Sequence, residues 1–215
     1  MAALNGTGLV ADDLFLMAHD EVSGRPHLSA RPAGLGLAGA LLAELVLAGH
    51  AGLVHGGVVA AGRAAPDDAL ERAVLDVLAA QGRCYGAREW LAFLARTSAG
   101  DVAARLARSG YLRETARRRR GPGGRRWVPA DPDCAFAPVI RAKAALDPSR
   151  PCPQERVVLA GLAAACGLGW RFLSYGPPDA RRCLDEAVRG LSPPLRELVA
   201  WTQAAADSAV LSYRR

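Results

Sequence analysis

The chain has 215 residues, of which 51% are hydrophobic and 22% are charged. It is therefore long and apolar enough to bury a sizeable core, and its composition excludes an intrinsically disordered protein. The formal net charge is +6, and the segment RRRRGPGGRR, residues 117–126, holds six arginines, so the rest of the chain is neutral. Because the positive charge is confined to one segment, we expect an anionic partner there: nucleic acid, acidic lipid or an acidic protein.

The first residues, MAALNGTGLVADD, contain no basic residue and become acidic at Asp12 and Asp13, which is unlike a secretory signal. The five cysteines are scattered and form no C-x-x-C motif. That pattern is typical of reduced thiols and not of a disulfide framework. We therefore expect a cytoplasmic protein.

The first half of the chain predicts one buried helix between turns. Ser23-Gly24 is a turn signal, and AGLGLAGALLAELVLAG, residues 33–49, predicts a helix that follows Pro32. This helix has only about the minimum length for a membrane span and contains Glu44, so we place it at the centre of a helical bundle. Glu44 should then lie at the bundle edge or be paired, because an isolated buried carboxylate is costly.

The next elements alternate between hairpins and amphipathic helices. GLVHGGVVAAG predicts a tight hairpin around Gly56-Gly57, and Pro66-Asp67-Asp68 starts an amphipathic helix. EWLAFL, residues 89–94, predicts a further helical stretch, and Ser98 is expected to cap a helix that ends at Gly110. Two candidate strands, Tyr111-Leu112 and Trp127-Val128, flank the arginine-rich segment.

From Phe136 onward the pattern is helical again. Residues 157–166, VVLAGLAAAC, are apolar on every side and predict a second fully buried helix, and an amphipathic stripe runs from Leu195 to Tyr213. The predicted fold class is mainly α: a single domain over residues 1–215, with a central buried helix bundle, surrounding amphipathic helices and one or two short β-hairpins.

Catalytic chemistry has no support in the sequence. The four histidines sit in turns without a cysteine or acid at ligand spacing, so we expect no metal site and no cofactor. The acid pairs Asp12-Asp13 and Asp67-Asp68 are explained by helix starts, and Asp131 by a helix cap. No P-loop, G-x-S-x-G or G-x-G-x-x-G motif is present. We therefore predict no catalytic residues and a protein that is not an enzyme.

Taken in order, several segments resemble the Golgi phosphoprotein family of phosphoinositide-binding adaptors and their bacterial relatives. They are DDLFLMAHDEVSGR, LAGALLAELVLAGHAGLV, PDDALERAVLDVL, ARSGYLR before an arginine-bearing hairpin, and VVLAGLAAACGL. The resemblance covers nearly the whole chain and implies a compact helical domain that docks peripherally on membranes. It also implies a client protein and self-association through the hairpin. The alanine- and arginine-rich composition indicates a bacterial member.

In the eukaryotic members a tryptophan and three arginines hold the head group of phosphatidylinositol 4-phosphate. The corresponding positions here are Ser29, Ala38, Arg96 and Ala99, so only Arg96 matches. Arg25 and Arg31 lie near the lost tryptophan position and are candidate substitutes. The resemblance therefore implies an anionic-lipid adaptor with lipid- or phosphate-binding residues Arg25, Arg31 and Arg96, without specifying the lipid.

The leading hypothesis is a peripheral membrane protein that uses the hairpin for contact: Arg117, Arg118, Arg119, Arg120, Arg125, Arg126 and Trp127. An alternative is a winged-helix-like nucleic-acid-binding protein with the same hairpin as its wing. Against this alternative, the preceding helix offers only Arg105 and Arg108 as polar side chains for base reading. An accessory enzyme of unknown reaction is the second alternative.

Overall fold

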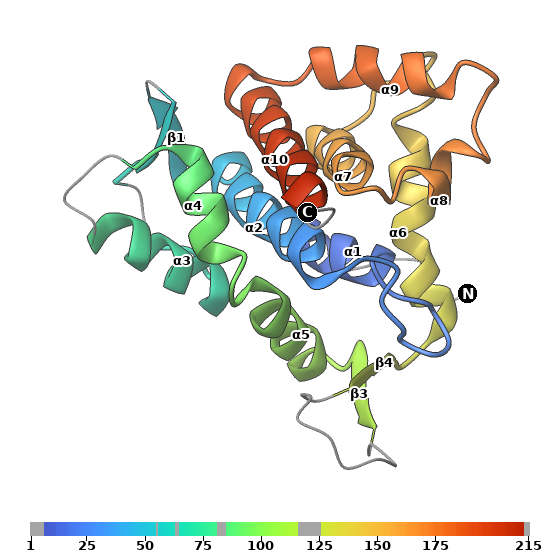
Figure 1. The fold of residues 1–215 in the computed structure, drawn as a ribbon, viewed down its shortest axis with the longest axis horizontal. Coiled ribbons are helices and arrows are strands. Elements are labelled where there is room, and N and C mark those ends of the chain that lie inside the picture. Colours follow the sequence, from blue (N-terminus) through green and yellow to red (C-terminus); the bar gives the residue numbers. More distant parts are fainter. Residues whose placement is uncertain (1–6, 55, 63–64, 81–84, 116–125, 213–215) are drawn as a thin grey trace.

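The computed structural model describes residues 7–54, 56–62, 65–80, 85–115 and 126–212, without the side chains of residues 210–212. This part of the chain is mainly helical, as predicted (Figure 1). In chain order the elements are α1 (Val10–Met17), α2 (Ala30–Leu47), β1 (Ala51–Val54), β2 (Gly57–Ala60), α3 (Ala69–Ala80), α4 (Ala87–Leu94), α5 (Ser98–Arg108), β3 (Leu112–Thr115), β4 (Arg126–Pro129), α6 (Pro132–Ala144), α7 (Gln154–Ala165), α8 (Trp170–Leu173), α9 (Ala180–Arg189) and α10 (Pro193–Ser212).

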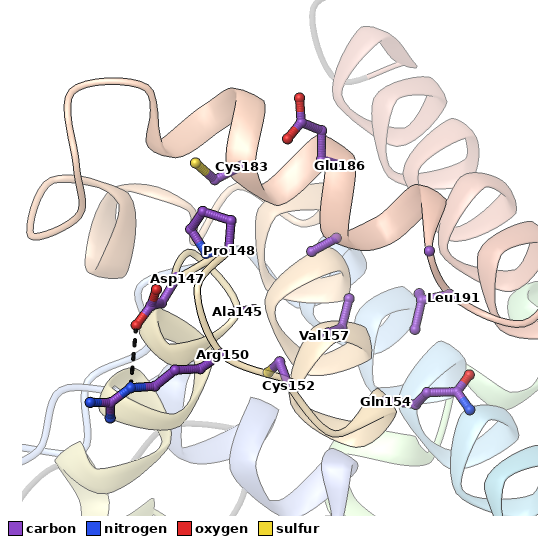
Figure 2. A pocket seen from close by; sticks show the side chains of 12 residues that line it. Ala145, Asp147, Pro148, Arg150, Cys152, Gln154, Val157, Cys183, Glu186 and Leu191 are labelled. Atoms are coloured by element: carbon purple, nitrogen blue, oxygen red, sulfur yellow. Dashed lines mark ion pairs between the residues drawn. The ribbon is translucent and has the colours of Figure 1, made fainter.

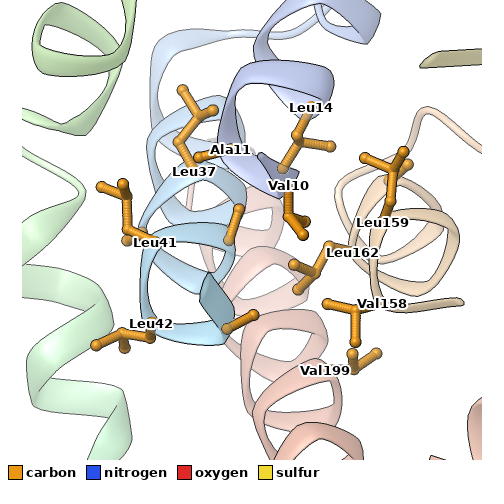
Figure 3. Close-up of a cluster of buried hydrophobic side chains, with 14 of the residues drawn as sticks. Val10, Ala11, Leu14, Leu37, Leu41, Leu42, Val158, Leu159, Leu162 and Val199 are labelled. Carbon is orange, nitrogen blue, oxygen red and sulfur yellow. The ribbon is translucent and has the colours of Figure 1, made fainter. Parts of the chain in front are cut away.

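The two helices that are apolar on every side lie at the centre, which confirms the prediction made for them. α2 packs against α1, α4, α5, α7 and α10, and α7 packs against α1, α2, α6, α9 and α10. Leu37, Leu41 and Leu42 of α2 lie in the same buried cluster as Val158 and Leu162 of α7 (Figure 3). Only a central position removes all faces of such helices from water, and this burial is the main stabilising contribution to the fold.

By length and composition α2 could cross a bilayer, with a mean hydropathy of 1.4 over its 18 residues. Thirteen of those residues, from Pro32 to Leu45, are instead buried by neighbouring helices. One contiguous hydrophobic core runs through the described residues from Val10 to Ala209. A single domain over residues 1–215 stays a prediction.

Both predicted hairpins are present as two-stranded antiparallel sheets. β1 pairs with β2, with Val54 opposite Gly57, so the turn comes one residue earlier than the predicted Gly56-Gly57 centre. β3 pairs with β4, with Leu112 opposite Pro129 and Thr115 opposite Arg126. The second hairpin projects from the end of the molecule opposite α9 (Figure 1).

One helix boundary differs from the prediction. Ser98 is the first residue of α5 and not its N-cap, which is Thr97. The Ser98 side chain is buried and its Oγ donates a hydrogen bond of 3.0 Å to the carbonyl oxygen of Gly34 in α2. The hydroxyl therefore joins two helices instead of capping one. By contrast, Asp131 caps α6 as predicted, because its carboxylate accepts from the Asp133 N–H.

Candidate membrane-docking face

The turn between α1 and α2 is held against the β3–β4 hairpin. The Arg126 guanidinium donates a hydrogen bond of 2.7 Å to the Ser23 carbonyl oxygen. Gly24 has a φ of +63°, and a Cβ at this position would lie 2.2 Å from the carbonyl oxygen of Trp127. Only glycine fits this close approach of two backbones. The contact brings the turn that carries the exposed Arg25 to the base of the β3–β4 hairpin.

The predicted hairpin residues fall into two groups. Arg117 to Arg120 and Arg125 lie outside the described residues. Arg126 is exposed at the start of β4, and Trp127 is partly buried against the core.

A second set of contacts fastens the α1–α2 turn to α8. The Arg171 guanidinium, 5% exposed, forms an ion pair with Glu21 and donates a bond of 3.4 Å to the His19 carbonyl oxygen. His27 meets the ring of Trp170 edge-on, with centroids 5.6 Å apart. The turn is thus fixed between α8 on one side and the hairpin on the other.

Asp20, Glu21 and His27 bring possible ligand atoms within 4.8 Å of one another, the geometry of a cation site. The oxygens already have protein partners. Asp20 Oδ1 accepts 2.7 Å bonds from the N–H and the hydroxyl of Ser23, and Glu21 is paired with Arg171. These contacts account for the cluster as the framework of the turn.

Arg31 and Arg96 come from elements that touch. Arg31 is in the first turn of α2, three residues before Gly34, and a Cβ on Gly34 would lie 2.4 Å from the carbonyl oxygen of Ala95. The Ser98 hydrogen bond to Gly34 fixes the same junction. Arg31 and Arg96 are both exposed and pair with no carboxylate among the described residues. The start of α2 and the end of α4 therefore present two unpaired guanidinium groups from adjoining backbone.

Arg96 borders a shallow depression of about 320 Å³ that is more aromatic than basic. It is lined by Tyr85, Glu89, Trp90, Phe93 and Arg96, and the Arg96 guanidinium carbon lies 5.5 Å from the centre of the Phe93 ring. Arg25 and Arg31 do not line it.

The other family positions differ in their accessibility. Ser29 and Ala99 are exposed, whereas Ala38 is completely buried in α2. A head group therefore cannot contact Ala38 from solvent. The spacing of the sequence located this position but could not show its burial.

Four charged side chains form a largely buried network behind this face. Arg105 of α5 is 4% exposed, and its Nε donates to Asp12 Oδ1 at 2.8 Å. Its terminal nitrogens reach Glu44 of α2 at 3.3 Å and Asp68 before α3 at 3.1 Å. Glu44 also accepts a 2.6 Å bond from the Ala11 N–H. The prediction that Glu44 is paired is confirmed.

Burial raises the pKa of Glu44 to about 7, against the opposing attraction of Arg105. Burial also raises the pKa of Asp12, again with Arg105 opposing. Desolvation lowers the pKa of Arg105, but Glu44 and Asp12 more than reverse this effect, so Arg105 stays charged. The network joins α1, α2, α3 and α5 through one cation.

This network corrects two inferences from the sequence. Arg105 was counted among the side chains that a winged-helix protein could offer to DNA, but it is buried and fully engaged by carboxylates. Of the two arginines considered, only Arg108 is exposed. Asp12 and Asp13 do lie in the first turn of α1, yet both form ion pairs, Asp13 with Arg141 at 2.5 Å. Distant partners of this kind leave no local sequence signal.

A separate pocket of about 330 Å³ lies at the opposite end of the molecule, between the α6–α7 connection and α9 (Figure 2). Asp147 and Arg150 form an ion pair of 3.9 Å at its mouth, and Cys152 and Cys183 contribute to its lining. Of the described residues that line it, only Arg150 is basic. This pocket is therefore distinct from the arginine-bearing face.

The described residues thus define a helical protein with two buried central helices and a β3–β4 hairpin braced by the α1–α2 turn. The family model described as Golgi phosphoprotein 3 (GPP34) matches residues 10–211, and the chain belongs to that family. The resemblance noted in the sequence is confirmed, and the family is one of adaptors and not of enzymes. No curated protein sequence matches the chain.

Proposed function

We propose that this protein is a non-enzymatic, cytoplasmic peripheral membrane protein that docks reversibly on anionic phospholipid surfaces. The observation that carries the proposal is the hydrogen bond from Arg126 to Ser23. It joins the α1–α2 turn, with Arg25, to the base of a hairpin whose sequence holds six arginines. Membership of an adaptor family supports the same conclusion.

Charge supplies most of the attraction in this proposal. Basic residues near an anionic leaflet contribute about 1 kcal/mol each, so six arginines give at most about 6 kcal/mol before repulsion and screening. That free energy suits reversible docking and is too small for permanent anchorage. Binding should therefore weaken steeply as salt is added.

A head-group site would be simpler than that of the eukaryotic members. Arg31 and Arg96 lie on adjoining elements and are free of carboxylate partners among the described residues, whereas Ala38 is buried. Two guanidinium groups can hold an anionic phosphate by charge-assisted hydrogen bonds. We infer a preference for anionic lipids in general, with these two arginines contributing.

The test is flotation with vesicles of phosphatidylcholine alone or with phosphatidylserine. The test variant replaces the six hairpin arginines with serine, and the control replaces six exposed arginines around α9: Arg150, Arg156, Arg181, Arg182, Arg189 and Arg196. Both variants lower the formal net charge from +6 to zero. We expect the hairpin variant to lose binding to anionic vesicles and the control to retain most of it.

Equal losses in both variants would show that net charge alone governs binding and would overturn the proposed face. If the parent protein ignores both kinds of vesicle and instead shifts duplex DNA with a steep salt dependence, the nucleic-acid hypothesis replaces this one.

A further inference from the structure

Large apolar side chains are exposed along the same turn, on α8 and just after α8. Val22 is 72% exposed, Trp170 is 57% exposed and Tyr175 is 64% exposed. Single exposed apolar side chains are ordinary, but several that share one surface mark a contact region.

The contacts of the α1–α2 turn bring Val22 and Trp170 to one surface. Glu21, the neighbour of Val22, forms an ion pair with Arg171, the neighbour of Trp170. His27, at the far end of the turn, packs edge-on against Trp170. Residues 150 positions apart in the sequence are thus held beside each other.

Val22 is presented by a rigid turn. Asp20 Oδ1 accepts a bond from the Val22 N–H at 3.3 Å and from the Ser23 N–H at 2.7 Å. The Asp20 N–H donates in turn to the Arg25 carbonyl oxygen at 2.8 Å. These bonds fix the backbone on both sides of Val22, whose side chain stays exposed.

Two exposed arginines lie close to Val22. Arg25 follows it by three residues, and Arg126 binds the carbonyl oxygen of Ser23, the next residue. Of the acids of the turn, Glu21 is neutralised by Arg171, and Asp20 accepts hydrogen bonds from Ser23. An apolar side chain and an indole ring near exposed arginines match the layered chemistry of an anionic bilayer, with phosphates outside and acyl chains within.

We propose that Val22 and Trp170 form a shallow insertion site that enters the interfacial layer of an anionic bilayer. The inference rests on the proposed function and adds to it a second, apolar contact separate from the hairpin. The arginines draw the protein to the surface, and the insertion of these side chains provides the part of the binding that salt does not screen.

The first experiment measures partition onto phosphatidylcholine–phosphatidylserine vesicles at low and high salt. The variant Val22→Ser/Trp170→Ser should bind about tenfold more weakly than the parent at both salt concentrations. Val54→Ser is the matched control, because Val54 is 47% exposed on β1, away from this turn in Figure 1. It should bind as the parent does. If the double variant does not fold, the single variant Val22→Ser is measured in its place.

A second pair of variants tests for gain of binding. Val22→Trp should partition more strongly than the parent, and its added fluorescence should be quenched by lipids brominated on the acyl chain. Val54→Trp should show neither effect. The same lipids should also quench the tryptophan fluorescence of the parent. This quenching should be smaller in Trp170→Phe, which keeps an apolar ring but removes the indole that emits.

If the parent binds anionic vesicles while Val22→Ser/Trp170→Ser binds equally well and Trp170 is not quenched, the insertion site is wrong and the proposed function stands. Failure of the parent to bind any vesicle overturns both. If the double variant changes only a concentration-dependent self-association, the surface contacts a second copy of the chain and the insertion proposal fails.

Discussion

Arg105 Nε donates a hydrogen bond of 2.8 Å to Asp12 Oδ1, and both side chains are withdrawn from solvent, at 4% and 1% exposure. These residues lie 93 positions apart, on α5 and α1. With Glu44 and Asp68 on the same guanidinium, Arg105 compensates carboxylates from three other parts of the fold. The β3–β4 hairpin follows directly after α5, so this network also anchors the element from which the proposed docking face extends.

Replacing Arg105 with methionine should destabilise the protein by about 3–5 kcal/mol, because it leaves buried carboxylates without their cation. Chemical denaturation measures the change in the free energy of unfolding. Arg108→Met, on the exposed side of the same helix, is the matched control and should change it little. Similar losses in both variants would mean that the network does not stabilise the fold.

Glu44 should make stability depend on pH. Its pKa is about 7 in the folded protein against an ordinary 4.5, so the folded chain holds this proton more tightly than the unfolded chain. The free energy of unfolding should therefore fall as pH rises from about 4.5 to about 7, and this contribution should level off above that. The shift corresponds to about 3 kcal/mol. Glu44→Gln should remove this part of the pH dependence, as measured by denaturation at several pH values. An unchanged pH profile in Glu44→Gln would refute the assignment.

Gly24→Ala should separate the α1–α2 turn from the hairpin, since its Cβ would lie 2.2 Å from the Trp127 carbonyl oxygen. Gly62 has the same φ of +63°, but a Cβ there meets nothing within 4 Å. Gly62→Ala therefore carries the same backbone strain without the clash. We expect weaker flotation with anionic vesicles for Gly24→Ala than for Gly62→Ala. Equal binding by the two folded variants would show that the turn and hairpin act independently.

Arg96→Ala should reduce binding to anionic vesicles by a few-fold, because one charge near a leaflet contributes about 1 kcal/mol. Arg88 is exposed on α4, the helix that ends two residues before Arg96, but it does not line the depression that contains Arg96. Arg88→Ala is thus the charge-matched control, and the two partition coefficients are compared at low salt. If both variants lose the same amount, Arg96 has no special place in lipid binding.

The local and periodic features of the fold were predictable from the sequence. Residues 33–49 and 157–166 are apolar on every side, and only a central position hides such helices from water, so α2 and α7 lie where expected. The strands around the arginine-rich segment were also predicted, since a Gly-Pro-Gly-Gly turn between short apolar stretches needs only neighbouring residues to specify it.

Long-range partners were decided by the tertiary structure. Ser98 has the residue type of a cap but binds Gly34, because packing of α5 on α2 brings the Gly34 carbonyl oxygen within reach of its hydroxyl. In the sequence Arg105 has the pattern of a surface arginine on an amphipathic helix. Its three carboxylate partners become apparent only when α1, α2 and the start of α3 are assembled around it.

The proposed docking face likewise combines features that the sequence predicts with features that only the tertiary structure brings together. The sequence by itself determined that positive charge is concentrated at residues 117–126, because charge is a property of composition that folding does not alter. Only the tertiary structure decided that the turn with Arg25 and Val22 lies against the hairpin on one side and against α8, with Trp170, on the other. Those relationships depend on backbone contacts between segments more than 100 residues apart, and such contacts exist only once the core has packed.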